Sequence, residues 1–138
     1  MATTVEVLRS VPLFEGMSDD AVATIAGVAE ELVYPAGSEL TRQGYPGESF
    51  IVIVTGRASV DVDGQRIREL GAGEYLGEIS LIDGGPRTAT VTAIESIEAL
   101  VLPRVAFDGL IDEFPAVRMD VLAALTRRIR ERAPALSD

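Results

Sequence analysis

The sequence predicts an α+β fold in which helices precede and follow an antiparallel, jelly-roll-like β roll. Apolar residues recur with a helical period near both ends of the chain, whereas the middle of the chain alternates with a period of two. Strand-like runs in the middle recur at intervals of about ten residues and are separated by glycine-rich turns, which is typical of a closed roll. We expect a single domain over 1–138, with helices at about 3–31, the roll at about 32–102 and further helices at about 104–133.

The N-terminal segment carries the signals of two helices. Thr3 and Glu6 have the spacing of a capping box, and Pro12 ends the short helix that follows them. Ser18 is a good N-cap, and the two aspartates after it would lie in the first turn, where the helix dipole favours acidic side chains. The apolar residues that share one face of this second helix are Val22, Ile25, Ala26 and Ala29.

The strands of the roll are identified by their alternation and by the turns between them. Residues 50–54 form a dense β-branched run of the kind found in buried central strands. Asp63 and Gly64 separate two alternating runs and predict a two-residue hairpin turn. The predicted strands are 32–34, 38–43, 50–54, 58–62, 66–70, 88–94 and 97–102.

Helical spacing returns after Pro103. A short helix is expected near residues 105–111, and a second one begins at Pro115 with an apolar stripe that reaches Ile129. Four arginines between residues 127 and 132 make this end of the chain locally basic. They are either a solvated helix end, whose cations complement the helix dipole, or part of a lid or docking helix that covers a pocket or a partner subunit.

The composition excludes several classes of function. The chain has no cysteine and no histidine, so disulfides, thiolate or imidazole metal sites and Ser-His-Asp triads are ruled out. A net charge of −10 disfavours nucleic acid polymers and anionic membranes as partners. No apolar run is long enough to span a bilayer, and the first residues lack the features of a signal peptide. We expect a cytoplasmic binding protein that is not an enzyme and holds no metal.

The segment from Gly77 to Val91 interrupts the strand pattern and carries most of the recognisable chemistry. Residues 78–82 suit one helical turn, whose free N–H groups attract a phosphate. Arg87 is able to pair with two phosphate oxygens at once, and Gly77 lets a ligand approach the main chain. The carboxylate of Glu78 suits a sugar hydroxyl. This combination predicts a site for a compact sugar phosphate or nucleotide.

The same segment resembles, almost position by position, the phosphate-binding cassette of the cyclic nucleotide-binding domain family. This family includes the bacterial catabolite activator, the regulatory subunits of cyclic-nucleotide-dependent kinases and cyclic-nucleotide-gated channels. Residues 35–50 and 54–60 resemble the family's glycine-rich signature, and residues 107–115 resemble its lid helices. The similarity extends from about Leu8 to Arg132, which is nearly the whole chain.

The resemblance implies that cAMP or cGMP is the ligand, and it assigns roles to individual residues. The residues implied for the cyclic phosphate are Arg87, Ser80, Thr88 and Ala89. Those implied for the ribose are Glu78, as acceptor of the 2′-hydroxyl, and Gly77. Those implied for the base pocket and lid are Val60, Ile67, Leu76 and Arg128. Val60 and Ile67 are expected to be core residues that also line the pocket.

Three hypotheses for the function remain open at this point. The first is a ligand-responsive regulatory or sensor module without a DNA-binding domain, read by an unknown protein partner or assembled as a homodimer through its C-terminal helix. The alternative is a degenerate domain of the same kind that acts as a protein interaction module, because Leu76 and Arg132 depart from the family pattern. A metal-dependent enzyme on a similar roll ranks below both, since its site would depend on histidine. Arg87 itself has the alternative reading of a surface residue paired with Glu69 or Asp83.

Overall fold

The computed structural model describes residues 4–11, 14, 17–47, 49–77, 86–113, 115, 118–119, 122–123 and 126. The chain forms two compact units. Residues 28–106 make up one of them, here called the roll unit, and residues 1–27 together with 107–138 make up the other, here called the helical unit.

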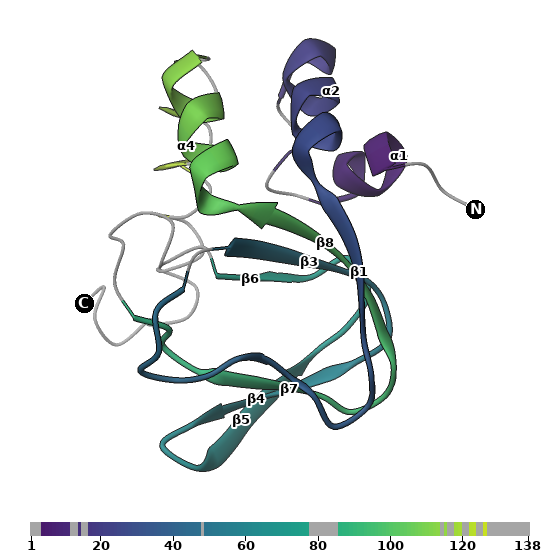
Figure 1. The fold of residues 1–138 in the computed structure, drawn as a ribbon, viewed down its shortest axis with the longest axis vertical. Coiled ribbons are helices and arrows are strands. Elements are labelled where there is room, and N and C mark those ends of the chain that lie inside the picture. Colours follow the sequence, from purple (N-terminus) through teal and green to yellow (C-terminus); the bar gives the residue numbers. More distant parts are fainter. Residues whose placement is uncertain are drawn as a thin grey trace. The chain divides into compact units, whose positions relative to one another are not determined.

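The roll unit consists of two antiparallel four-stranded sheets that face each other (Figure 1). The first sheet has the order β1 (Glu30–Tyr34), β8 (Ile97–Pro103), β3 (Ser49–Thr55) and β6 (Tyr75–Leu76). The second has the order β2 (Glu39–Thr41), β7 (Thr90–Ala93), β4 (Ala58–Val62) and β5 (Gln65–Leu70). The predicted antiparallel roll is therefore confirmed, with helices before and after it in the chain.

The space between the two sheets is filled by one apolar cluster. Ile51 and Ile53 of β3 belong to it, and successive side chains of a strand point to opposite faces. Phe50 and Val52 therefore lie on the other face of β3, and both are also fully buried. The β-branched run at residues 50–54 thus forms a strand that is buried on both faces, as predicted. The cluster consists of Ile51, Ile53, Ala58, Val60, Leu70, Leu76, Val91, Ala93, Ile97, Ala99 and Val101.

The predicted hairpin turn is present in the structure. The structure also contains one strand that was not predicted. Asp63 and Gly64 have φ angles of 53° and 81°, the conformation of a two-residue hairpin turn between β4 and β5. The added strand is β6, whose two residues pair with Ile51 and Val52 of β3. It is too short to show an alternating pattern, so only the pairing reveals it.

In the helical unit, the described helices begin close to where the sequence predicts them. They are α1 (Thr4–Arg9), α2 (Asp19–Val28) and α4 (Arg104–Glu113), of which α2 and α4 each share residues with the roll unit. Ser18 caps α2, because its hydroxyl accepts a hydrogen bond of 3.2 Å from the main-chain N–H of Ala21. Arg9 donates to the carbonyl oxygen of Met17 and pairs with Asp19, which ties the connection between α1 and α2.

Some expectations fall where the structure gives no description. Thr3 of the predicted capping box and the four arginines at residues 127–132 lie outside the described residues, as does most of the helix predicted from Pro115. Among the helices that are described, none has the length and hydropathy needed to cross a membrane.

Candidate ligand-binding site

Arg87 is the buried cation of the roll unit around which the candidate site is built. Its side chain is only 7% exposed. Its Nη2 donates hydrogen bonds to the carbonyl oxygen of Ser49 at 2.9 Å and to the hydroxyl of Ser49 at 3.2 Å. Its main-chain N–H donates to the carbonyl oxygen of Tyr45, and its own carbonyl accepts from Gly44, both at 2.9 Å. Side chain and main chain are therefore both tied to a segment about 40 residues earlier in the sequence.

The alternative prediction, that Arg87 is a surface residue paired with Glu69, is wrong. Glu69 pairs instead with Arg57, at 3.1 Å, on the exposed surface of the roll. Asp83, the other partner considered, lies outside the described residues. A buried arginine needs a specific reason to be there, because burial of a guanidinium is costly unless it is hydrogen-bonded.

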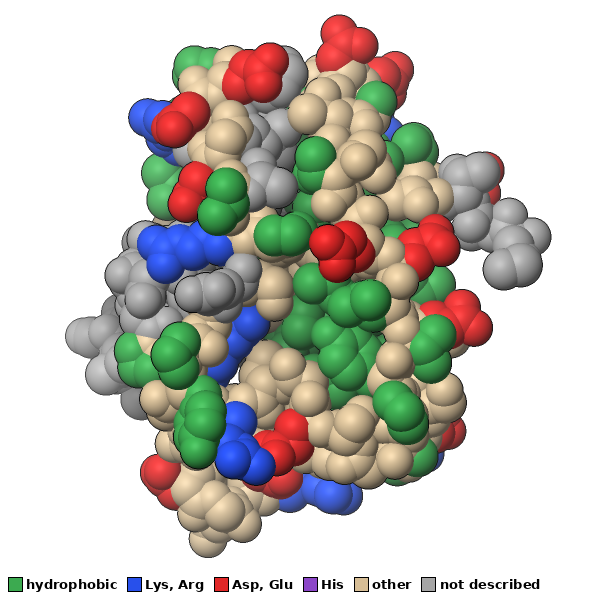
Figure 2. Space-filling view, viewed as in Figure 1, with side chains coloured by type: hydrophobic (Ala, Val, Ile, Leu, Met, Phe, Trp, Pro, Cys, Tyr) green, Lys and Arg blue, Asp and Glu red, His purple; other side chains and the backbone are tan. Residues whose placement is uncertain are grey.

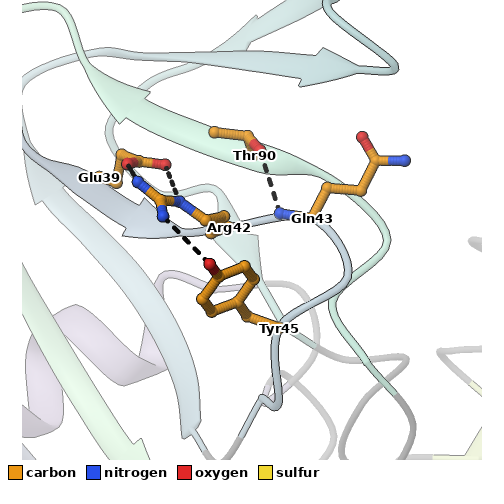
Figure 3. Close-up of polar contacts among 5 residues, drawn as sticks. All are labelled: Glu39, Arg42, Gln43, Tyr45 and Thr90. Carbon is orange, nitrogen blue, oxygen red and sulfur yellow. Dashed lines mark hydrogen bonds and ion pairs between the residues drawn. The ribbon is translucent and has the colours of Figure 1, made fainter.

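The main chain next to Arg87 is held by hydrogen bonds to the end of β2 and to the segment that follows it. The hydroxyl of Thr41 donates to the carbonyl oxygen of Ala89 at 3.1 Å. The main-chain N–H of Gln43 donates to the hydroxyl of Thr90 at 3.0 Å, as Figure 3 shows. These contacts join positions 47 and 48 residues apart, so they fix Arg87 even though β7 begins only at Thr90.

Two glycines leave the space through which the Arg87 side chain passes. A Cβ added at Gly47 would lie 2.6 Å from Cδ and 2.8 Å from Cζ of Arg87. A Cβ added at Gly77, whose φ is 94°, would lie 2.5 Å from Nη1 of Arg87 and 2.6 Å from the carbonyl oxygen of Ser49. Glycine is therefore required at position 77 by the arginine and by the main chain, before any ligand is considered.

A cleft of about 580 Å³ opens beside Arg87. This volume lies within the range of about 300–1,000 Å³ that is usual for small-molecule sites. Figure 2 shows the hollowed face, with basic side chains next to the hollow. The cleft is lined by Glu39, Leu40, Thr41, Arg42, Tyr45, Pro46, Ser49 and Arg87. Its walls are mostly polar, apart from Leu40 and Pro46, so the cleft suits a polar, anionic ligand with an apolar part.

Glu39, Arg42 and Tyr45 form one rim of this cleft (Figure 3). Arg42 grips the Glu39 carboxylate through two hydrogen bonds, of 2.6 Å from Nη2 and 3.2 Å from Nε. The Arg42 guanidinium carbon also lies 5.1 Å from the centre of the Tyr45 ring. The tyrosine ring is 56% exposed and is thus held at the edge of the cleft without being buried.

Hydrogen bonding lowers one pKa near the site, and burial raises another. The hydrogen bonds from Arg42 lower the pKa of the Glu39 carboxyl below its ordinary value. Burial raises the pKa of the Tyr34 phenol on β1, and the positive charge of Arg87 offsets part of that rise. The field of Arg87 thus reaches Tyr34, which packs against the apolar cluster of the roll.

Arg42→Ala is expected to raise the pKa of Glu39 toward its ordinary value. In the parent protein the lowered pKa means that the pair stabilises the fold above the ordinary pKa of glutamate, and that this contribution is lost as the pH falls through the lowered value. Since both side chains are substantially exposed, the effect on stability should be small and should shrink with added salt. An NMR titration of the Glu39 carboxyl measures the shift, and an unchanged midpoint would contradict it. Arg66→Ala is the control, because Arg66 pairs with Asp61 instead.

The structure places the described residues of the predicted site in three environments. Gly77 and Arg87 adjoin each other. Ala89 is half-buried and packs against the apolar cluster, to which Val60 and Leu76 belong with 6% exposure each. Thr88 is exposed, directly after Arg87. Glu78, Ser80 and Arg128 lie outside the described residues.

One expectation about the pocket is wrong. Ile67 was expected in the core, but it lies on β5 and is 59% exposed. The reason is that β5 is the edge strand of its sheet, and all of its residues except Leu70 are exposed. An alternating pattern shows that a strand has two faces, but it does not show whether the strand lies at an edge.

Other residues of the site were not foreseen. Ser49, Thr41 and Gly47 contact the Arg87 segment, and Glu39, Arg42 and Tyr45 form the rim. The only feature of the sequence that could have indicated the rim is that its three residues follow one another at intervals of three positions. In the part of the chain that the structure describes, no group of three or more acidic side chains is placed to hold a metal ion.

Comparison with known proteins gives consistent matches. A family model described as "cyclic nucleotide-binding domain" matches residues 31–114, which covers most of the roll unit and α4. The chain is 33% identical over 129 residues to the cyclic AMP receptor protein of Thermus thermophilus, covering 90% of this chain and 60% of that protein. It is 37% identical over 118 residues to cGMP-dependent protein kinase, isozyme 1, of Drosophila melanogaster, covering 80% of this chain and 15% of the kinase.

A solved structure agrees with these matches. The regulatory domain of Toxoplasma gondii PKA, co-crystallised with cAMP, has a TM-score of 0.80 and 25% identity, and the match covers 93% of this chain and 49% of that one. The chain spans only 60–62% of the length of the bacterial regulators that it matches first.

Proposed function

We propose that this chain, which belongs to the cyclic nucleotide-binding domain family, binds cAMP or cGMP in the cleft beside Arg87 and acts as a regulatory or sensor module. The observation that carries the proposal is the buried guanidinium of Arg87 at the wall of a cleft of suitable size. A cyclic phosphodiester bears one negative charge, so one guanidinium matches it in charge and supplies a two-pronged hydrogen-bonding partner.

The wall of the cleft also supports an apolar part of the ligand. Leu40 lines the cleft and packs against the apolar cluster that includes Val60 and Leu76. A purine placed against Leu40 would therefore continue the apolar surface of the roll interior, while its phosphate reached Arg87. This arrangement favours a nucleotide over an inorganic anion.

The roles of the remaining residues are carried over from the family resemblance. In this proposal Ser80, Thr88 and Ala89 assist Arg87 at the phosphate, and Gly77 and Glu78 take the ribose. The base and lid positions are Val60, Ile67, Leu76 and Arg128. Ile67 and Thr88 are exposed and are not among the residues that line the cleft, so their roles rest on the family resemblance.

The output of the module is proposed to be conformational, with no catalytic step and no metal. A ligand shifts a population only if it binds one state more tightly than the other, so lid closure has to add contacts to the bound nucleotide. We place residues 1–138 in one cytoplasmic domain whose reader is a protein partner, with a second copy at the C-terminal helix as one candidate. The net charge of −10 argues against nucleic acid or an anionic membrane as that partner.

Side-by-side titration with cAMP and cGMP tests the proposal and ranks the two ligands. At a concentration one hundred times the dissociation constant, a ligand of the folded state should stabilise the protein by about 2.7 kcal/mol, which a thermal-unfolding assay detects as a higher midpoint. Adenosine and guanosine are the matched controls, because they lack the phosphate that Arg87 would bind. If neither cyclic nucleotide moves the midpoint nor gives a calorimetric signal, the chain is better explained as an interaction module with a degenerate pocket.

A further inference from the structure

The side chain of Arg87 runs through a narrow slot in the roll unit. Gly47 and Gly77 each lie so close to it that a Cβ at either position would come within 3 Å of an arginine side-chain atom. Ser49 accepts hydrogen bonds from Nη2 with both its carbonyl oxygen and its hydroxyl. The arginine is thereby restrained along its length and at its tip.

Gly47 is the informative member of this slot. Its φ lies outside the left-handed region, so its main-chain conformation is one that alanine adopts readily. The three atoms nearest to an added Cβ all belong to the Arg87 side chain. The absence of a side chain at position 47 therefore matters because of the arginine.

We propose that Gly47 and Ser49 are positioning residues that hold the Arg87 guanidinium in one orientation at the cleft before a ligand arrives. The ligand in this proposal is a cyclic phosphodiester, and its identity rests on the proposed function. An arginine in solvent loses the freedom of several rotatable bonds when it grips a phosphate, and that loss weakens binding. A side chain that is already held loses less freedom, so the slot should increase affinity through the arginine that it holds.

Gly47→Ala tests the slot directly, with Gly71→Ala as the matched control. The new methyl group at position 47 should displace Arg87 and raise the dissociation constant for cAMP and cGMP by about tenfold or more, the size of one lost hydrogen bond to a charged group. Gly71 also has an ordinary φ, and an added Cβ there would meet nothing within 4 Å. Gly71→Ala should therefore bind within about twofold of the parent, a difference well below that expected for a lost contact.

Ser49 provides a second variant whose effect does not depend on the first. Ser49→Ala removes the hydroxyl and keeps the carbonyl, so the loss of affinity should be smaller, about threefold to tenfold. Ser49→Thr restores a hydroxyl at the same place and should bring the affinity back toward the parent value. If threonine fails to rescue an effect of alanine, the hydroxyl is not the group that positions Arg87.

A measurement on the ligand-free protein separates this inference from the proposed function. The Nε–H of a held, buried guanidinium exchanges slowly with water, and its NMR signal is assigned by its loss in Arg87→Lys. We expect slow exchange in the parent and in Gly71→Ala, and at least about tenfold faster exchange in Gly47→Ala, as expected when a group becomes exposed to solvent.

The two proposals then fail in different ways. If the parent binds neither nucleotide, the proposed function is wrong, and the exchange rates still decide whether Gly47 positions the arginine. If the parent binds a cyclic nucleotide but Gly47→Ala binds it equally well, or protects the Nε–H equally well, the positioning inference is wrong and the proposed function stands.

Discussion

Arg87→Glu is expected to weaken the binding of cAMP and cGMP by about a hundredfold or more, because it removes the cation and places a carboxylate toward the phosphodiester. Isothermal titration calorimetry of parent and variant measures the loss. Since the side chain at this position is only 7% exposed, an unpaired glutamate there should also lower the unfolding temperature. The titration is therefore run at a temperature at which both proteins are folded.

Two control variants separate the specific role of Arg87 from a general change of charge. Arg66→Glu makes the same change of charge at a side chain that is 57% exposed, and it should leave nucleotide binding nearly unchanged. Arg87→Lys keeps the charge but loses the planar fork, so an intermediate loss is expected. If Arg87→Glu binds both nucleotides as tightly as the parent, the phosphate role of Arg87 and the placement of the ligand in the cleft beside it are both wrong.

Gly77→Ala is expected to have a large effect on stability, which should reduce the free energy of unfolding by about 2–5 kcal/mol. Of this, about 1–2 kcal/mol arises because alanine is strained at a positive φ. The rest, about 1–3 kcal/mol, arises because the new Cβ would overlap Arg87 and the carbonyl oxygen of Ser49, and a main-chain atom in a strand has little room to move. Urea unfolding measures the loss.

Gly73→Ala is the matched control for this prediction. Gly73 has a φ of 85°, close to the 94° of Gly77, but an added Cβ there would meet nothing within 4 Å. The control therefore carries the backbone strain without the overlap, and it should lose only about 1–2 kcal/mol. Equal losses for the two variants would show that Arg87 and Ser49 do not occupy the space beside Gly77.

The glycine at position 77 illustrates the limit of what a glycine in the sequence can indicate. From the sequence, Gly77 was expected to allow close approach of a ligand. In the structure, the space beside Gly77 is filled by Arg87 and by Ser49, which belongs to another strand. A glycine signal shows that something comes close to the main chain, but it does not show what that is.

The candidate site was predictable only in part. Residues within one continuous segment were identified, whereas contacts between residues far apart in the sequence were not. Arg87 and Gly77 were identified because they lie in one continuous segment with a recognisable pattern. Ser49 was missed because it meets Arg87 across 38 residues, and neither segment carries a signal of that contact. Ile67 was misjudged for a related reason, since the edge position of β5 depends on which strands pair with it.

The sequence by itself determined the local conformations and the chemistry of single groups. Alternation predicted the roll, Asp63 and Gly64 predicted their turn, and the segment after Leu76 predicted an anion-binding site. The tertiary structure alone decided which of these segments meet. It alone reveals the slot that holds Arg87, the rim around Arg42 and the exposure of β5. The physical reason is that periodicity and turn propensity depend on neighbouring residues, whereas burial and side-chain contacts depend on which distant segments meet, as in the hydrogen bonds that join residues 38 and 48 positions apart.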